Sequence, residues 1–262
     1  MDLGIAGKKA LVMSSSRGLG LGIAEALAAE GCDVLLTGRT EDKLRAAAEA
    51  ITAQGSGRAY FVRVDLTEEM SVDVLAAAAE EKLGQVDILV NNTGGPPPGR
   101  MVDAEPDVLA LQFDAMVLRV VALTKRMLPG MRERGWGRII TVGSSGVVQP
   151  IPNLGLSNAV RSALVGWSKS LAGDVAADGV TVNMLLPGRI HTERVDELDA
   201  AAAGRTGKSV EATRTASRAT IPAGRYGTVE EFAAVAAFLA SAQASYVTGS
   251  LVRCDGGAIR GV

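Results

Sequence analysis

The sequence has few aromatic residues, 1 histidine and 2 cysteines. Aromatic residues make up only 3% of its 262 residues, so small aliphatic side chains must fill most of the core. A hydrophobic content of 47% is enough to bury a substantial core. Cys32 and Cys254 lie far apart, as is typical of reduced packing residues in a cytoplasmic protein. We therefore predict a cytoplasmic location and no metal site.

Strong charge of one sign and long apolar runs are also missing. The formal net charge is −2 and no basic tract occurs, which argues against binding to nucleic acid or to an anionic membrane. No apolar run reaches the roughly 18 residues that cross a bilayer. Segment 1–9 lacks the basic-then-apolar order of a secretion signal. The expected partner is therefore a small molecule, not a nucleic acid or a membrane.

The sequence instead alternates short apolar runs with longer alanine-rich segments. The apolar runs do not alternate apolar with polar positions, which is typical of strands buried on both faces. The predicted strands are 9–13, 33–37, 59–64, 86–90, 138–142, 180–185 and 250–254, and the predicted helices are 20–30, 41–54, 68–83, 106–134, 156–177 and 229–241. This repetition predicts an α/β protein with a doubly wound parallel sheet (Rossmann fold) in three layers. No linker separates two cores, so we predict one domain over 1–262.

Two segments interrupt the alternation, 91–99 and 192–227. Both follow predicted strands, and in open parallel sheets ligands bind beyond the carboxyl ends of the strands. We predict that 192–227 is a substrate loop or lid, the alternative being a floppy surface loop. Within it, 204–209 looks like a phosphate-binding P-loop. We attribute this to chance, because Ala202 replaces a required glycine and 199–203 looks helical.

The first predicted strand runs into a glycine-rich turn that opens a helix. Glycines in such a turn let the backbone approach a pyrophosphate whose charge lies against the helix N-terminus. Because the turn opens the first strand–helix–strand unit, it predicts a dinucleotide site rather than a non-binding remnant turn. A positive φ at Ser14 would cost free energy because this residue carries a Cβ. The predicted binding residues are Ser14, Ser16, Arg17, Gly18, Leu19 and Gly20.

The second predicted strand is followed by Gly38 and Arg39. NAD enzymes of this build place a carboxylate near position 38 to accept a hydrogen bond from the ribose 2′-hydroxyl. No carboxylate stands there, and Arg39 with Arg17 could form a cationic clamp for a 2′-phosphate. Either arginine alone is more often a solvated surface charge. Together they favour NADP over NAD.

The chain resembles the short-chain dehydrogenase/reductase family on motifs that span nearly all of its length. Ser144 ends a predicted strand, and Ser157 and Arg161 follow on a helix, at the positions of that family's Ser and Tyr-x-x-x-Lys. The resemblance is greatest to the 3-oxoacyl-carrier-protein-reductase-like branch and implies an oxidoreductase with a nicotinamide cofactor. Further cofactor-binding residues implied by the resemblance are Asp65, Leu66, Asn92, Thr93, Gly94, Pro187, Gly188, Ile190 and Thr192.

Three of the four catalytic positions of that family differ in this chain. Ser157 replaces the tyrosine that donates the proton, Arg161 replaces the lysine that lowers its pKa, and Met116 replaces an asparagine. Arg161 stays protonated and cannot act as a base, but it could stabilise an oxyanion or clamp a carboxylate. His191 could donate a proton near neutral pH or point to solvent. The predicted catalytic residues are Ser144, Ser157, Arg161 and His191.

These substitutions leave three hypotheses open. The first, which we favour, is an NADP-dependent oxidoreductase that takes its proton from water, His191 or the substrate. The second is a non-redox enzyme in which Arg161 and Ser144 stabilise an anion. The third is a catalytically silent NADP-binding or scaffold protein. A Ser-His-Asp hydrolase is disfavoured, because 143–146 is not the Gly-x-Ser-x-Gly elbow.

The resemblance also implies self-association. Members of the family commonly form tetramers or dimers through two long helices, which correspond here to 106–134 and 156–177. Ala159, Ala163 and Gly166 would permit close helix packing. We therefore predict a homo-oligomer, a tetramer or a dimer.

Overall fold

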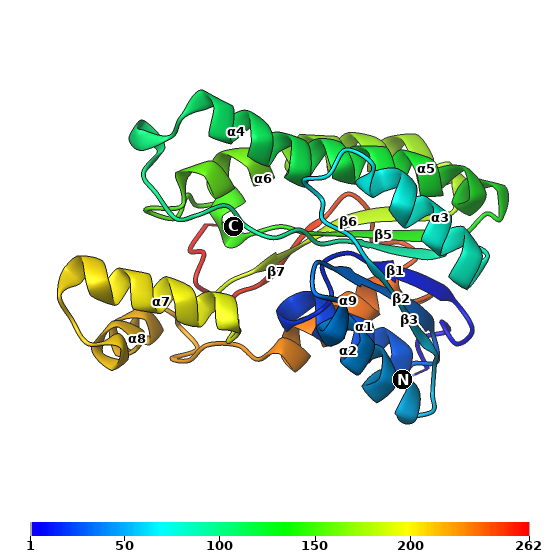
Figure 1. Cartoon of the computed structure of the whole chain (residues 1–262), viewed down its shortest axis with the longest axis horizontal. Coiled ribbons are helices and arrows are strands. Elements are labelled where there is room, and N and C mark those ends of the chain that lie inside the picture. The colour runs from blue at the N-terminus through cyan, green and yellow to red at the C-terminus, as the bar shows by residue number, and fades with distance from the viewer. Residues whose placement is uncertain (1, 262) are drawn as a thin grey trace.

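A parallel sheet of seven strands lies at the centre of the computed structural model, which describes residues 2–261 (Figure 1). Its order is β3-β2-β1-β4-β5-β6-β7. The strands are β1 (Lys9–Val12), β2 (Asp33–Gly38), β3 (Ala59–Arg63), β4 (Ile88–Asn91), β5 (Gly137–Val142), β6 (Val180–Pro187) and β7 (Leu251–Cys254). Ala10 pairs with Val34 on β2 and with Ile88 on β4, so the winding reverses at β1. The predicted doubly wound sheet is confirmed, and this reversal opens a crevice at the carboxyl ends of the strands.

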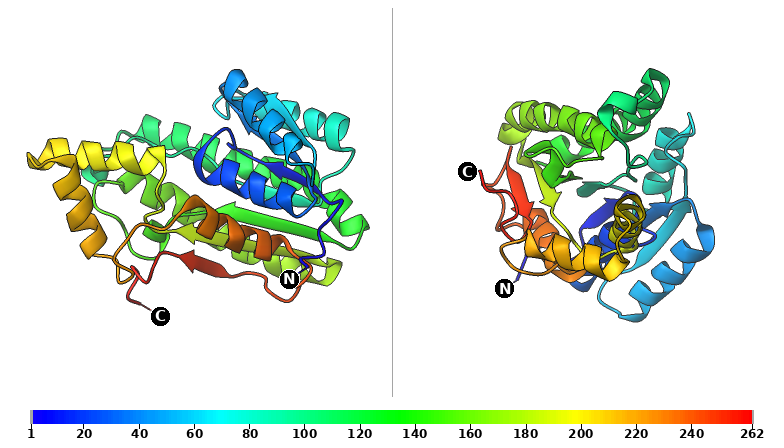
Figure 2. Two further views of the ribbon diagram at one scale, coloured as in Figure 1. Left: turned by 90° about the horizontal axis from the view of Figure 1, so that it is seen from below. Right: turned by 90° about the vertical axis from the view of Figure 1, so that its left-hand side faces the viewer.

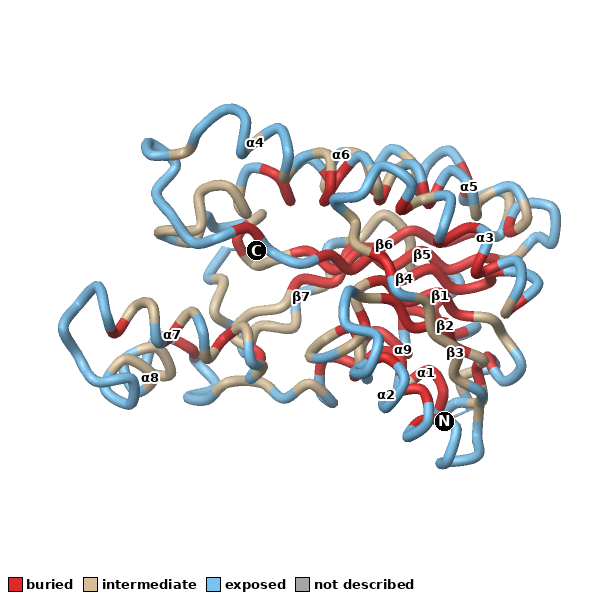
Figure 3. Tube along the Cα trace, in the orientation of Figure 1, coloured by how far each residue is buried: buried red, intermediate tan, exposed pale blue. Residues whose placement is uncertain are grey.

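Helices cover both faces of the sheet (Figures 1 and 2). One face carries α1 (Gly18–Ala29), α2 (Glu41–Ala53) and α9 (Val229–Ala240), and the other carries α3 (Ser71–Leu83), α4 (Pro106–Phe113), α5 (Arg119–Glu133) and α6 (Gly155–Val175). Figure 3 shows the strands as the buried centre between these layers. Burial on both faces explains the continuous apolar runs. No helix within residues 2–261 is both long enough and apolar enough to cross a membrane.

Every predicted strand is present, with its ends within two residues of the expected positions. The predicted helix 68–83 begins only at Ser71, because the amides of Glu68 and Ser71 bond to the carbonyls of Asp65 and Glu68 and form turns there. The predicted helix 106–134 contains a π-helical turn, Asp114–Leu118, between α4 and α5. Such turns often occur at functional sites. This one carries Met116, which is buried.

Segment 192–227 is not a floppy loop, so that alternative is wrong. It forms α7 (Glu193–Thr206) and α8 (Val210–Ala219), which extend beyond the carboxyl ends of the strands (Figure 1). Thr192 caps α7 by accepting a hydrogen bond from the Val195 amide, and Ser209 caps α8 by accepting one from the Ala212 amide. These caps satisfy amides that a helix leaves unpaired at its start. We name residues 192–227 the helical excursion.

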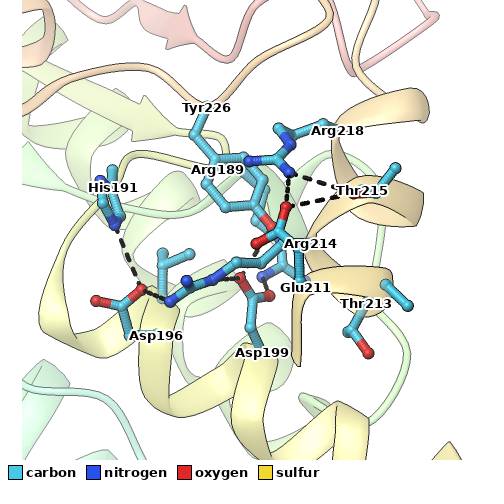
Figure 4. A network of polar contacts seen from close by, with 12 residues as sticks. Arg189, His191, Asp196, Asp199, Glu211, Thr213, Arg214, Thr215, Arg218 and Tyr226 are labelled. Carbon is cyan, nitrogen blue, oxygen red and sulfur yellow. Dashed lines mark hydrogen bonds and ion pairs between the residues drawn. The ribbon is translucent and has the colours of Figure 1, made fainter. Parts of the chain in front are cut away.

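A polar network holds the helical excursion in place (Figure 4). The Asp199 carboxylate on α7 is fully buried and accepts hydrogen bonds from Arg189 Nη1 at 2.8 Å and from the Tyr226 hydroxyl at 2.9 Å. Arg214 on α8 donates to Asp196 at 2.5 Å. A buried carboxylate needs such partners to offset its desolvation. The network therefore joins α7 and α8 to the segments on either side of them.

Candidate active site

A cleft of about 1050 Å³ lies at the carboxyl ends of the strands. This is at the upper end of the roughly 300–1,000 Å³ of small-molecule sites, so a ligand larger than a simple metabolite fits. Of the residues predicted to form the site, all except Gly20 and His191 line it. The predicted residues that line it are Ser14, Ser16, Arg17, Gly18, Leu19, Arg39, Asp65, Leu66, Asn92, Thr93, Gly94, Ser144, Ser157, Arg161, Pro187, Gly188, Ile190 and Thr192.

The turn after β1 is tied to the end of β2. The Ser14 amide donates to Thr37 Oγ1 at 3.0 Å, and the buried Ser15 hydroxyl donates to the Val12 carbonyl at 2.7 Å. The Thr37 amide in turn donates to Ser15 Oγ at 2.9 Å. This bonding holds Ser14 at φ 47 and leads into Gly18 at φ 58. The turn therefore keeps the glycine-type backbone although a serine occupies its first position.

Gly20 does not line the cleft but packs against the turn after β1. A Cβ at Gly20 would collide with the Ser14 carbonyl oxygen and lie 2.7 Å from Asn92 Nδ2. Asn92 Nδ2 itself donates to the Ser14 carbonyl at 3.1 Å. The prediction that Gly20 contacts a ligand is therefore corrected. Its role is to let α1 approach the turn after β1 and the loop after β4, so that amides at the start of α1 face the cleft.

Replacing Ser14 with glycine should raise the free energy of unfolding by up to about 1 kcal/mol. A left-handed conformation costs a residue with a Cβ roughly 1–2 kcal/mol, and the greater flexibility of unfolded glycine cancels part of this gain. Thermal or urea denaturation measures the difference. Ser16→Gly is the matched control, because Ser16 is not among the residues with positive φ, and it should destabilise the protein. A Ser14→Gly variant less stable than the parent would show that the serine side chain stabilises the turn.

Charged side chains that follow β1, β2 and β3 line one part of the cleft. Arg17, which precedes α1, forms ion pairs with Glu193 and, at 3.8 Å, with Glu197 of α7. Arg39 has no ion-pair partner among residues 2–261. The Asp65 carboxylate accepts hydrogen bonds from the Thr67 amide and hydroxyl, and these bonds and the nearby Arg39 lower its pKa. The two predicted arginines thus face one cleft, although α7 already engages Arg17.

Gly38 is too closely packed to carry a side chain without rearrangement. A Cβ there would lie 3.1 Å from Ser16 Oγ and 3.2 Å from Ser16 Cβ. A carboxylate at this position, as NAD enzymes of this build use, would therefore displace Ser16.

Ser144, two residues after β5, and Ser157, on α6, line the cleft. Ser144 Oγ accepts a hydrogen bond from the Gly146 amide at 3.0 Å. Asn158, the neighbour of Ser157, donates to the Ile151 carbonyl at 2.9 Å and accepts from its amide at 3.3 Å. The sequence alone did not predict these two hydrogen bonds. Asn158 fixes the loop between β5 and α6 and so places the two serines on one wall.

Arg161 joins the two walls of the cleft. Its Nη1 donates to the Val142 carbonyl at 3.0 Å, and its Nη2 donates to the carbonyls of Gly94 at 3.1 Å and Thr93 at 3.4 Å. Burial, and next the charge of Arg194, lowers the pKa of Arg161 to about 10. The guanidinium therefore stays charged at neutral pH and can stabilise negative charge, but it cannot supply a proton there.

His191 does not reach the cleft, so its predicted catalytic role is corrected. Its side chain is 63% exposed, with Nε2 3.3 Å from Asp196 Oδ1 in the network of Figure 4. The adjacent Ile190 takes the inward position and is buried. Tyr226 bonds to Asp199, and Tyr246 is fully exposed. Among the described residues, the cleft wall contains no tyrosine, histidine, lysine or cysteine.

Four further arginines that were not among the predicted site residues line the cleft: Arg189, Arg194, Arg205 and Arg260. Arg194 Nη2 donates to the Pro96 carbonyl at 2.8 Å. Its position two residues after Thr192, at the end of a predicted nicotinamide loop, was the one available signal. Arg205 follows from α7 only when the direction of that helix is known, and Arg260 arrives from the distant C-terminal segment.

Comparison with known proteins gives consistent matches over almost the whole chain. A family model described as "Enoyl-(Acyl carrier protein) reductase" matches residues 13–258. The 3-oxoacyl-(acyl-carrier-protein) reductase FabG of Escherichia coli is 37% identical over 257 residues, which cover 96% of this chain and 97% of that protein.

Two solved structures show the same fold. L-sorbose reductase from Gluconobacter frateurii, complexed with NADPH and L-sorbose, superposes with a TM-score of 0.94 and is 33% identical, with 100% of both chains covered. The 3-oxoacyl (acyl-carrier-protein) reductase from Agrobacterium tumefaciens with NADP bound has a TM-score of 0.88 and is 32% identical, with 97% of this chain and 95% of that chain covered.

Proposed function

Because the chain belongs to the short-chain dehydrogenase/reductase family, we propose that it is an NADP-dependent oxidoreductase for a carbonyl or alcohol substrate. When bound, the nicotinamide would supply or accept the hydride. The observation that carries the proposal is the turn after β1. Its backbone is held at φ 47 and φ 58, and Gly20 behind it leaves no room for a Cβ. Such a turn lets phosphate oxygens reach the amides at the start of α1.

The residues of the cleft fit the parts of this cofactor in order. Ser14, Ser16 and the start of α1 would hold the pyrophosphate, and Asp65 and Leu66 would flank the adenine. Asn92–Gly94 and Pro187–Thr192, at the ends of β4 and β6, would hold the nicotinamide end near Ser144. The two solved relatives described above contain NADPH or NADP. Calorimetric titration of the protein with NADPH and with NADH tests this proposal. If neither nucleotide releases heat on binding or protects the protein against thermal denaturation, the proposal is overturned.

Replacing Arg39 with aspartate should lower the preference for NADPH over NADH about 10- to 100-fold. A charge-assisted bond to a 2′-phosphate contributes roughly 1.5–3 kcal/mol, and an aspartate would instead accept from a ribose 2′-hydroxyl. The ratio of the two dissociation constants measures the effect. Arg63→Asp is the control, since Arg63 lies nearby at the end of β3 but does not line the cleft. An unchanged ratio in Arg39→Asp would show that Arg39 does not select the cofactor.

The cleft also determines how the proton is handled. With no tyrosine, histidine, lysine or cysteine in the described wall, a protein group that donates near neutral pH is missing. We propose that the oxygen of the substrate takes its proton from water, while Arg161 and the hydroxyls of Ser144 and Ser157 stabilise its charge. Stopped-flow measurement of NADPH oxidation with ketones, imines and quinones tests this step.

The same absence favours a second candidate, a protein that binds NADP without turnover. Tight binding of NADPH with no oxidation across that substrate panel, unaffected by Ser144→Ala, would support this candidate against the oxidoreductase.

A cytoplasmic location remains a prediction of the sequence.

We further propose that the protein is a homo-oligomer. Apolar side chains are exposed along and beside α4, with Val102 75%, Leu111 51% and Leu118 50% accessible. A second copy covering these residues would remove them from water. Sedimentation showing a monomer at micromolar concentration would overturn this assignment.

A further inference from the structure

The charge on the cleft wall is strongly one-sided. Seven arginines line it against three carboxylates, whereas the whole chain has a net charge of −2. The carboxylates are already engaged, because Asp65 bonds to Thr67, Glu193 pairs with Arg17, and Glu197 pairs with Arg194 at 3.3 Å and with Arg17 at 3.8 Å. Concentrated cationic charge in a cleft attracts anionic ligands. The proposed cofactor accounts for Arg17 and Arg39 at one end, but not for the arginines at the other.

Two of those remaining arginines face one small space beside Gly95. A Cβ placed on Gly95 would lie 3.7 Å from Arg194 Nη2 and 4.0 Å from Arg161 Nη2. The loop after β4 holds both groups through its carbonyls, that of Pro96 for Arg194 and that of Gly94 for Arg161. Both guanidiniums therefore reach the cleft from fixed positions, one from α6 and one from α7.

The charge of Arg161 is not neutralised by the protein. Arg161 is only 8% exposed, and it has no ion-pair partner among residues 2–261. The hydrogen bonds of Arg161 use Nη1 and Nη2 and leave Nε without a partner in that range. Carbonyl oxygens reduce the cost of burying a cation but do not cancel its charge. A ligand carboxylate would cancel it and match the planar fork of the guanidinium.

The position of Arg161 indicates where such a carboxylate would lie relative to the reacting group. Arg161 bonds to the carbonyl of Val142, two residues before Ser144, and lies one helical turn from Ser157. Ser144 and Ser157 are the groups that, together with Arg161, we propose for the substrate oxygen. A carboxylate on Arg161 would therefore be attached at or next to the carbonyl carbon.

We propose that the substrate is a 2-oxo acid, or the 2-hydroxy acid in the reverse direction, with its carboxylate bound between Arg161 and Arg194. This inference rests on the proposed oxidoreductase function. In the reductive direction the carbonyl carbon gains a hydride as NADPH becomes NADP⁺. The π electrons of the C=O bond move to oxygen, and that oxygen takes a proton from water.

A matched set of probes tests the carboxylate separately from the redox chemistry. The probes are 2-oxo-4-phenylbutanoate, its ethyl ester, 4-phenylbutan-2-one and phenyl phosphate, titrated by calorimetry into the protein with and without saturating NADP⁺. We expect the acid to bind about 10- to 100-fold more tightly than the ester or the ketone, as charge-assisted hydrogen bonds predict. Phenyl phosphate binding more tightly than the acid would overturn the carboxylate in favour of a phosphate ester.

Arg194→Gln is the diagnostic variant, because this side chain is 41% exposed and can be replaced with little effect on folding. It should weaken binding of the acid about 10-fold and leave binding of the ester unchanged. Arg132→Gln removes the same charge from an exposed ion pair with Asp178, away from the cleft, and serves as the control. Equal loss of acid and ester binding, or no loss of either, would overturn the proposal.

The outcomes also separate this inference from the proposed function. Acid binding that depends on Arg194, with no NADPH oxidation by any probe, would support the anion site and reject the oxidoreductase. Oxidation of NADPH by the ketone or the ester, with no preference for the acid, would support the oxidoreductase and reject the anion site.

Discussion

Replacing Arg161 with glutamine should lower the rate of reduction of a neutral ketone about 100- to 1,000-fold while NADPH binding changes little. When a hydride adds to the carbonyl carbon, negative charge moves onto the substrate oxygen. The described cleft wall contains no tyrosine, histidine, lysine or cysteine that could neutralise this charge by donating a proton. Arg161 is the buried cation there, fixed by the carbonyls of Val142 and Gly94. A fixed charge costs no reorganisation during the reaction, so its loss should appear mainly in kcat.

Because Arg161 also joins the two walls of the cleft, its structural role must be separated from its electrostatic role. Arg161→Lys keeps the charge and can still donate to a carbonyl, so it should recover much of the lost rate. Ser157→Ala, one helical turn away, removes a hydroxyl without changing charge and should cost less. Thermal denaturation of all three variants checks folding. Comparable kcat values for the glutamine variant and the parent would exclude Arg161 from oxyanion stabilisation.

The features that the sequence predicted well depend on local patterns. Continuous apolar runs identified every strand, since burial on both faces removes alternation. The cost of a positive φ at Ser14 followed from its place in a glycine-rich turn, and the residue has φ 47. The cleft residues after β4 and β6 followed from the rule that ligands bind beyond the carboxyl ends of parallel strands.

The features that the sequence did not predict depend on side-chain direction and on distant contacts. His191 and Ile190 are neighbours, and only the fold determines that Ile190 turns inward while His191 turns toward Asp196. Arg194 reaches the cleft because the buried Asp199 fixes α7, and no local pattern marks that contact. Similarly, Gly20 looked like a ligand-contacting glycine, whereas its requirement comes from the close approach of Ser14 and Asn92.

Combining Ser157→Tyr with Arg161→Lys should raise the rate of reduction of a neutral ketone about 100-fold or more. The resemblance to the short-chain dehydrogenase/reductase family places a phenol and a lysine at these positions, and a positioned general acid contributes about 10²- to 10⁴-fold. Ser157 lines the cleft and is only partly buried, so a larger side chain has open space before it. The lysine, four residues later on α6, would lower the pKa of the new phenol by its charge. The measurement is kcat/KM for 4-phenylbutan-2-one as a function of pH.

The matched control is Ser157→Phe with Arg161→Lys, which has the same bulk and charge but no phenolic proton. If α6 presents position 157 to the reacting oxygen, only the tyrosine variant gains rate, and its rate depends on one ionisation that the phenylalanine variant lacks. Equal rates in the two variants would show that position 157 does not face the reacting oxygen. The opposite change is expected for 2-oxo-4-phenylbutanoate, because lysine cannot form the paired hydrogen bonds of the guanidinium fork. A higher kcat/KM for the ketone together with a lower kcat/KM for the acid would link the presence of Ser157 and Arg161, in place of Tyr and Lys, to the negative charge of the substrate.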